Sequence, residues 1–190
     1  PFNFELATIL VNDQVAREAL TSKQERRFLD FVRGDSHYSR YYDAFYILLN
    51  TGLRISEFCG LTVGDIDFER GSVCVSKQLQ RSSDMRYYIE RPKTVPMSEG
   101  VAECFRRVVA NRPKPPMEPV VDGVSGFLFL DKNQKPRVAL HWEKHFQYAV
   151  AKHNRIYKDE LPKITPHVCR HTFCSKMARK GMDPVKLKYV

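Results

Sequence analysis

Residues 165–172 read TPHVCRHT, so that two histidines and an arginine fall within little more than one helical turn. Thr165 is of a type that caps helix N-termini, and Pro166 suits the first helical position. His167 is therefore expected near a helix N-terminus, where unpaired N–H groups and the helix dipole favour negative charge. The stretch predicts a helix whose first turn can bind a phosphate.

The spacing of this motif places His167, Arg170, His171 and Cys174 on one helix face. Two other interpretations fit the same spacing. The histidines and Cys174 could bind a metal, although zinc needs three or four ligands and Arg170 would repel a cation. The motif could also be core packing, and we expect this structural role for His171, next to Phe173.

The composition describes a basic protein that can bury a core. The chain has 190 residues, 43% of them hydrophobic, and a formal net charge of +9. This length suits one domain, and the charge favours a polyanion, with nucleic acid ahead of an anionic membrane surface. Five cysteines without a C-x-x-C pair, and no apolar run of transmembrane length, indicate buried free thiols in a reduced, cytoplasmic compartment.

The periodicity predicts a mainly α chain with a small three-stranded antiparallel β-sheet. Capping-box spacing at Thr21 and Ser22 starts a helix that Gly34 ends, and Gly52 and Gly60 end the next two. Further helices are expected after Ser98, around Trp142–His153, from Thr165 to Gly181, and from Asp183. The strands are expected at residues 73–79, 86–90 and 95–97.

One join in the predicted sheet is unusual. Lys93-Thr94-Val95-Pro96 has no Gly, Asn or Asp, and its two β-branched residues avoid positive φ. We therefore hypothesise that a loop is missing from the sequence between Thr94 and Val95.

Two further cations are candidates for the same site as Arg170. Arg54 follows Thr51-Gly52-Leu53 at a helix elbow, where Glu57 could orient it; the pair could equally be an ordinary surface ion pair. Lys93 could donate a proton to a leaving oxygen, or it could be a solvated charge at the sheet edge.

The sequence contains no phosphate-binding glycine loop, no G-x-S-x-G and no clustered carboxylates for two metal ions. A phosphoryl-transfer site without such carboxylates must offset charge with cationic side chains. Two arginines and a lysine can do this, and we expect no cofactor and no metal.

Three motifs, in family order, resemble those of the tyrosine recombinases, or phage integrase family. TGLRISE at 51–57 is similar to the first arginine motif, and TPHVCRHTF at 165–173 resembles the H-x-x-R-H box. PKT at 92–94 with VPM at 95–97 resembles the two sides of the hairpin that carries the family lysine, and LTVGDID at 61–67 resembles the segment leading into the sheet. The resemblance covers about residues 21–190 and is nearest to integrases of conjugative transposons.

The resemblance implies a fold and a mechanism. The fold would be the tyrosine recombinase catalytic domain, acting on double-stranded DNA for integration and excision of a mobile element. A tyrosine would attack the scissile phosphate and form a 3′-phosphotyrosine. Arg54 and Arg170 would hold the non-bridging oxygens, Lys93 would protonate the leaving 5′ oxygen, and His167 would take part in proton transfer. No metal or nucleotide is implied, because the covalent intermediate keeps the phosphodiester energy.

The resemblance also implies parts that the sequence lacks. The family nucleophile follows a G-H motif expected after residues 187–190, and Tyr189 comes too early to be it. Residues 1–20 are expected to be a linker from a missing N-terminal core-binding domain, and residues 21–190 a catalytic domain cut before its nucleophile. Such a chain would bind DNA without cleaving it, and the full-length protein would form a tetramer on two duplexes, associated with the nucleoid. The alternatives are a non-catalytic basic DNA-binding module and a type IB topoisomerase-like enzyme.

Overall fold

The computed structural model of the chain describes residues 19–81 and 85–183, with only the backbone of residue 81 and residues 85–91 in the sheet. The helices are α1 (Ser22–Gly34), α2 (Tyr42–Thr51), α3 (Ile55–Gly60), α4 (Glu99–Ala110), α5 (Ala139–Ile156) and α6 (Pro166–Arg179), with 3-10 turns η1 (Ser39–Tyr41) and η2 (Val63–Asp65). The strands are β1 (Ile66–Asp67), β2 (Ser72–Arg81) and β3 (Met85–Pro96). The mainly helical class with a three-stranded antiparallel sheet is confirmed. Among the described residues, no helix is long and apolar enough to cross a membrane.

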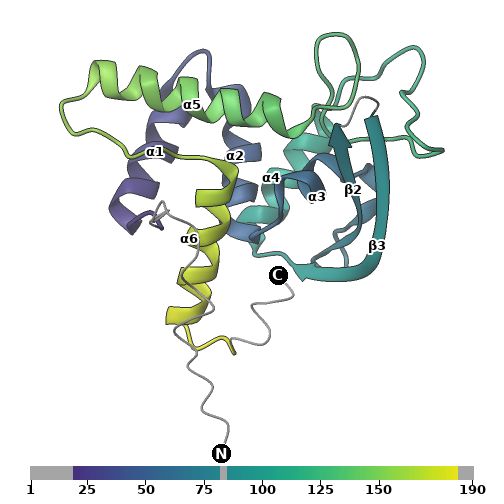
Figure 1. The fold of residues 1–190 in the computed structure, drawn as a ribbon, viewed down its shortest axis with the longest axis horizontal. Helices are drawn as coiled ribbons and strands as arrows, with labels where there is room; N and C mark the ends of the chain where they lie inside the picture. The colour runs from purple at the N-terminus through teal and green to yellow at the C-terminus, as the bar shows by residue number, and fades with distance from the viewer. Residues whose placement is uncertain (1–18, 82–84, 184–190) are drawn as a thin grey trace, which may run out of the picture.

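Helix α2 lies at the centre of the helical part. It packs against α1, α4 and α6, and Figure 1 shows α5 running across the ends of α1 and α2. Phe45 of α2 stacks on Phe146 of α5 with ring centroids 4.1 Å apart, and on Phe28 of α1 at 5.4 Å. All three rings are fully buried, so this aromatic cluster joins three helices from distant parts of the sequence.

The helix boundaries follow the expected local signals. Thr21 and Gln24 form a reciprocal capping box at the start of α1, and Gly52 ends α2 in the left-handed conformation with φ 67°. Thr165 caps α6 through the backbone N–H of Val168, with Pro166 at the first position. The helix expected from Asp183 onward lies outside the described residues.

The sheet corrects the expected strand assignment. Its order is β1-β2-β3, and β3 holds both of the segments that the sequence assigned to separate strands. Thr94 pairs with Cys74 and Val95 with Val73, so the hypothesis of a missing loop between Thr94 and Val95 is wrong for this structure. The two β-branched residues that argued against a turn are residues that favour a strand.

A bulge interrupts the β2–β3 pairing next to Lys93. Val75 pairs with Lys93 and Lys77 with Ile89, so that residues 90–92 lie opposite Ser76 alone. Pro92 cannot donate a ladder hydrogen bond, which makes a bulge a suitable place for it. Lys93 directly follows the bulge and pairs with Val75. Paired residues face the same side of a sheet, and Val75 is buried, so the side chain of Lys93 faces the core side.

The start of the described chain is fastened to α6. The backbone N–H of Leu20 donates to Oγ1 of Thr172 at 3.0 Å, and that hydroxyl donates to the carbonyl of Val168 at 2.7 Å. One turn further along α6, Lys176 Nζ lies 2.6 Å from Oε1 of Glu25 in α1. Leu20, the last residue of the expected linker, is buried; residues 1–18 lie outside the described range, so the linker stays a prediction.

We expect Thr172→Val to lower the free energy of unfolding by about 1–3 kcal/mol, because it leaves the buried N–H of Leu20 without an acceptor. Thr172→Ser keeps the hydroxyl and should retain most of the stability. Urea unfolding followed by circular dichroism measures both variants. Equal losses in the two would show that the hydroxyl contributes nothing.

Candidate active site

Arg54 lies at the elbow between α2 and α3, where the preceding residues are buried but its own side chain is exposed. Gly52 turns the chain, Leu53 is buried, and Arg54 is the N-cap residue of α3. Its side chain remains 48% exposed although its neighbours are in the core. A fixed backbone on both sides therefore holds a guanidinium that can still meet a ligand from solvent.

Glu57 is the buried anion on which this region depends. Its side chain has no exposed area. Oε1 accepts from Nη1 of Arg54 at 2.8 Å and from Nζ of Lys93 at 2.7 Å, while Oε2 accepts from the backbone N–H of Arg54 at 2.8 Å. The sequence indicated the Arg54–Glu57 pair at i, i+3 spacing but missed the contact with Lys93, because that residue is 36 positions away.

Lys93 approaches Glu57 from the sheet. It lies directly after the bulge in β3, and its side chain is 21% exposed. The packing of β2 against α3 places Lys93 over the first turn of α3. The expectation that residues 92–94 and 95–97 form opposite sides of a hairpin is wrong, since residues 92–96 are continuous in β3. The contact of Lys93 with Glu57, the partner of Arg54, does not depend on that expectation.

Arg170 reaches the same elbow from α6. Its Nη1 donates to the backbone carbonyl of Gly52, a contact between residues 118 positions apart. Burial lowers the pKa of Arg170, and the charge of Arg54 lowers it further. Two guanidinium groups thus lie close enough to repel each other, and an anion bound between them would relieve that repulsion.

The two histidines of the motif are both exposed on α6. His167 occupies the first turn, on the same face as Arg170 and one turn before it. The core packing expected for His171 is wrong: the buried face of α6 is formed by Val168, Cys169 and Thr172 instead. Whether His171 supports the site from behind the other residues stays a prediction. The expectation of buried thiols holds for Cys59, Cys104 and Cys169, whereas Cys74 is exposed and Cys174 half-buried.

The structure therefore brings Arg54, Lys93 and Arg170 to one elbow through their hydrogen bonds to Glu57 and to the carbonyl of Gly52. His167 is linked to them through helix α6. Within residues 19–81 and 85–183, no group of three His, Cys, Asp or Glu side chains could hold a metal ion. The charge available to a ligand comes from side-chain cations supplied by three separate elements.

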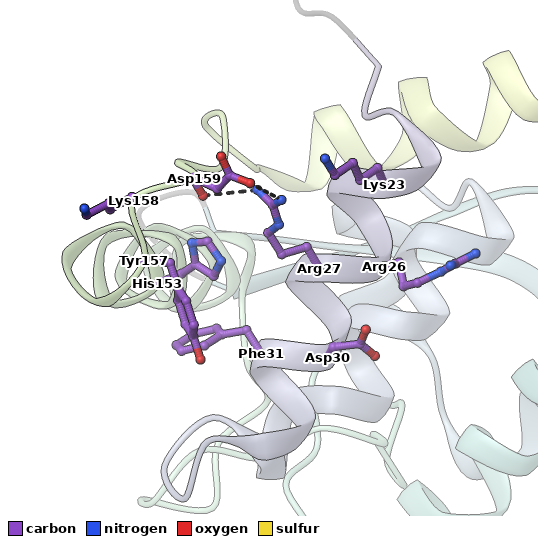
Figure 2. Close-up of a pocket in the computed structure, with 9 residues that line it drawn as sticks. All are labelled: Lys23, Arg26, Arg27, Asp30, Phe31, His153, Tyr157, Lys158 and Asp159. Atoms are coloured by element: carbon purple, nitrogen blue, oxygen red, sulfur yellow. Dashed lines mark hydrogen bonds and ion pairs between the residues drawn. The ribbon is translucent and has the colours of Figure 1, made fainter.

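Three cavities in the described part of the chain lie away from these residues. One of about 650 Å³ lies between α1 and the end of α5, lined by Arg27, His153 and Tyr157 among others. Figure 2 shows Arg27 bonded to Asp159 at its edge, which fastens the segment leading into α6. Arg54 is exposed and Lys93 and Arg170 are partly exposed, so a ligand can reach the site from solvent.

A helical domain with a small antiparallel sheet thus presents two arginines and a lysine, which are side chains of the kind that bind phosphate oxygens. The model of the phage integrase family matches residues 18–190. The chain belongs to this family, the tyrosine recombinases, as its motifs predicted.

Relatives and solved structures agree with this membership. The transposase from transposon Tn916 of Enterococcus faecalis is 45% identical over 196 aligned residues, covering 100% of this chain and 48% of the relative. A structure of the Tn1549 transposon integrase with circular intermediate DNA has a TM-score of 0.87 at 41% identity, covering 98% of this chain and 62% of that one.

The crystal structure of XerA recombinase has a TM-score of 0.63 at 22% identity, with 89% of this chain and 53% of that chain covered, and supports the fold alone. The chain spans about half the length of the curated transposases it matches.

We expect Glu57→Gln to lower the free energy of unfolding by roughly 2 kcal/mol, because it leaves two cations beside a neutral amide in a buried position. The matched control is Glu99→Gln, which breaks the exposed pair with Arg106 and should cost less than about 1 kcal/mol. Urea unfolding measures both. A loss for Glu57→Gln no larger than the control would contradict the anchoring role.

Proposed function

We propose that this chain is the catalytic domain of a site-specific DNA recombinase that cleaves and rejoins strands through a 3′-phosphotyrosine, for integration and excision of a mobile element. The observation that carries the proposal is the convergence of Arg54, Lys93 and Arg170 on one open elbow, held by the Glu57 carboxylate and the Gly52 carbonyl. The DNA complexes of the similar Tn1549 integrase support DNA as the substrate.

Each cation has a role that its position supports. Arg54 and Arg170 would bind the non-bridging oxygens of the scissile phosphate and offset the charge that grows in the transition state. Lys93 would protonate the leaving 5′ oxygen, with Glu57 holding the ammonium group in place. His167, in the first turn of α6, would take part in proton transfer with the nucleophile.

The remaining parts of the reaction are also proposals. We assign the nucleophile to a tyrosine outside residues 19–81 and 85–183, and no cofactor is required because the phosphotyrosine conserves the bond energy. The partner would be double-stranded DNA. The protein would act in the cytoplasm, associated with the nucleoid, and its working assembly would be a tetramer on two DNA duplexes.

We expect Arg54→Ala and Arg170→Ala each to reduce formation of the covalent protein–DNA adduct by about 100-fold or more, because each removes a donor to the transition state. The assay uses a nicked suicide DNA duplex. The protein assayed contains this chain and has the full length of its relatives. Arg106→Ala, which removes an exposed cation of α4, should react like the parent. Duplex binding without any adduct in the parent would favour the non-catalytic binding module instead.

We expect Lys93→Met to slow cleavage by about 100-fold or more on an ordinary duplex, because the 5′ oxygen then leaves without a proton. A duplex with sulfur at that bridging position should restore the rate, since a thiol with a pKa near 8.5 leaves as the anion. The matched control is Lys77→Met, which removes a lysine of the same sheet that forms an ion pair with Asp65 of η2. An equal defect on both duplexes would rule out proton donation by Lys93.

A further inference from the structure

Three of the six histidines in the sequence lie near the N-terminal end of α2, opposite the α2–α3 elbow that holds Arg54. His37 and Arg40 lie on the turn before α2, and Arg137, His141 and His145 lie at the start of α5. All four of the other groups act on the ring of His145 as nearby positive charges. We call these five residues the histidine–arginine cluster.

The centre of this cluster is built from stacked rings and a guanidinium. His145 stacks on Tyr41 with centroids 4.1 Å apart and an interplanar angle of 27°. Nη1 of Arg137 lies 2.9 Å from Nε2 of His145, and the same guanidinium lies 5.7 Å from the ring centroids of Tyr41 and Trp142. Nε of Arg137 donates to the carbonyl of Leu130, which fixes the group against the loop before α5.

A cavity of about 560 Å³ lies beside this centre and is lined by Tyr41, Arg137 and Trp142, the groups that contact His145. Its lining includes Arg40, Arg137, Arg107 and Arg112, with Asp43 as the carboxylate. Asp43 is bound by Arg107 through Nε and Nη2, and Arg112 pairs with Glu118. The carboxylates in these contacts are therefore committed to two of the arginines, while Arg137 bonds a carbonyl and an imidazole.

Such an environment favours an added anion. Burial lowers the pKa of His145 to about 4, and Arg137, His141, His37 and Arg40 lower it as well, so its ring is neutral near pH 7. A neutral imidazole can accept the hydrogen bond from Arg137, and the cationic groups still repel one another. An anion in the cavity would offset that repulsion.

We propose that the histidine–arginine cluster is a second anion site, which binds a phosphate group either of the DNA backbone or of a free phosphate compound. Tyr41 immediately precedes α2 and Gly52 immediately follows it, so the site lies about 15 Å from the catalytic elbow along a ten-residue helix. The site stands on its own contacts and does not require strand cleavage.

The site should bind more tightly as the pH falls. A bound anion offsets the nearby positive charges that help to lower the pKa of His145, so it raises that pKa while burial still lowers it, and binding is coupled to the uptake of a proton. Affinity for the anion therefore increases as the pH falls. Tyr41 from the turn before α2 and Trp142 from α5 complete the surroundings of the His145 ring.

The first test measures sulfate binding to the full chain by the ring signals of His145 in NMR. Sulfate is a tetrahedral dianion whose charge is constant over this range of pH. We expect saturable binding that tightens from about pH 7.5 to about pH 5, with most of the pH dependence lost in His145→Gln. Absence of saturable binding near pH 5, or an unchanged pH profile in His145→Gln, would overturn the proposal.

The second test separates the two sources of phosphate. We expect sulfate binding to weaken about tenfold in Arg137→Gln and in Arg40→Gln, with Arg106→Gln as the control. Arg40 is exposed and makes no buried contact, so Arg40→Gln folds even if Arg137→Gln does not. If the ligand is the DNA backbone, duplex affinity also falls and the salt slope decreases by about one in each variant. If the ligand is a free phosphate compound, duplex affinity and slope stay unchanged while sulfate binding falls. Undiminished sulfate binding in both variants would rule the site out.

Discussion

The buried carboxylate of Glu57 is the interaction on which the candidate active site depends. A fully buried charge is costly unless it is paired and hydrogen-bonded, and Glu57 meets that condition with two cations and one backbone N–H. Two of these bonds are within the start of α3, and the bond from Lys93 joins that start to β3. The energetic requirement of one anion therefore sets the relative position of two catalytic candidates that are 39 residues apart in sequence.

The third cation is brought in by a different kind of contact. Arg170 bonds the carbonyl of Gly52, and that carbonyl is at the end of α2 because a glycine in the left-handed conformation ends the helix there. The packing of α6 on α2 and the fastening of Leu20 to Thr172 hold α6 in register with the elbow. Arg54 and Arg170 are consequently held near each other with unfavourable charge, and a phosphate between them removes that cost.

Helix α2 also relates this elbow to the histidine–arginine cluster. The helix has a fully buried core face and packs on α1, α4 and α6, which makes it a rigid spacer. Cationic groups at both ends of one buried helix have a fixed separation. If both proposed sites bind phosphate, the helix would keep the two phosphate groups at a set distance.

The sequence by itself determined the helices, their caps and the identity of the cationic residues. These depend on neighbours within a few positions: Thr21 with Gln24, Thr165 with Val168, and glycine at position 52. The motifs at 51–57 and 165–173 were sufficient for the family, because residue type and order carry that information. The site roles of Arg54, Lys93, His167 and Arg170 remain proposals.

The tertiary structure decided what local spacing cannot encode. The continuous β3 and its bulge depend on pairing with β2, so a turn was wrongly expected at residues 93–96. The contact of Lys93 with Glu57 and the exposure of His171 depend on which face of each element meets the core. The histidine–arginine cluster joins residues 37–41 to residues 137–145, and no sequence period relates those segments, because only the packing of α5 on the helices beneath it brings them together.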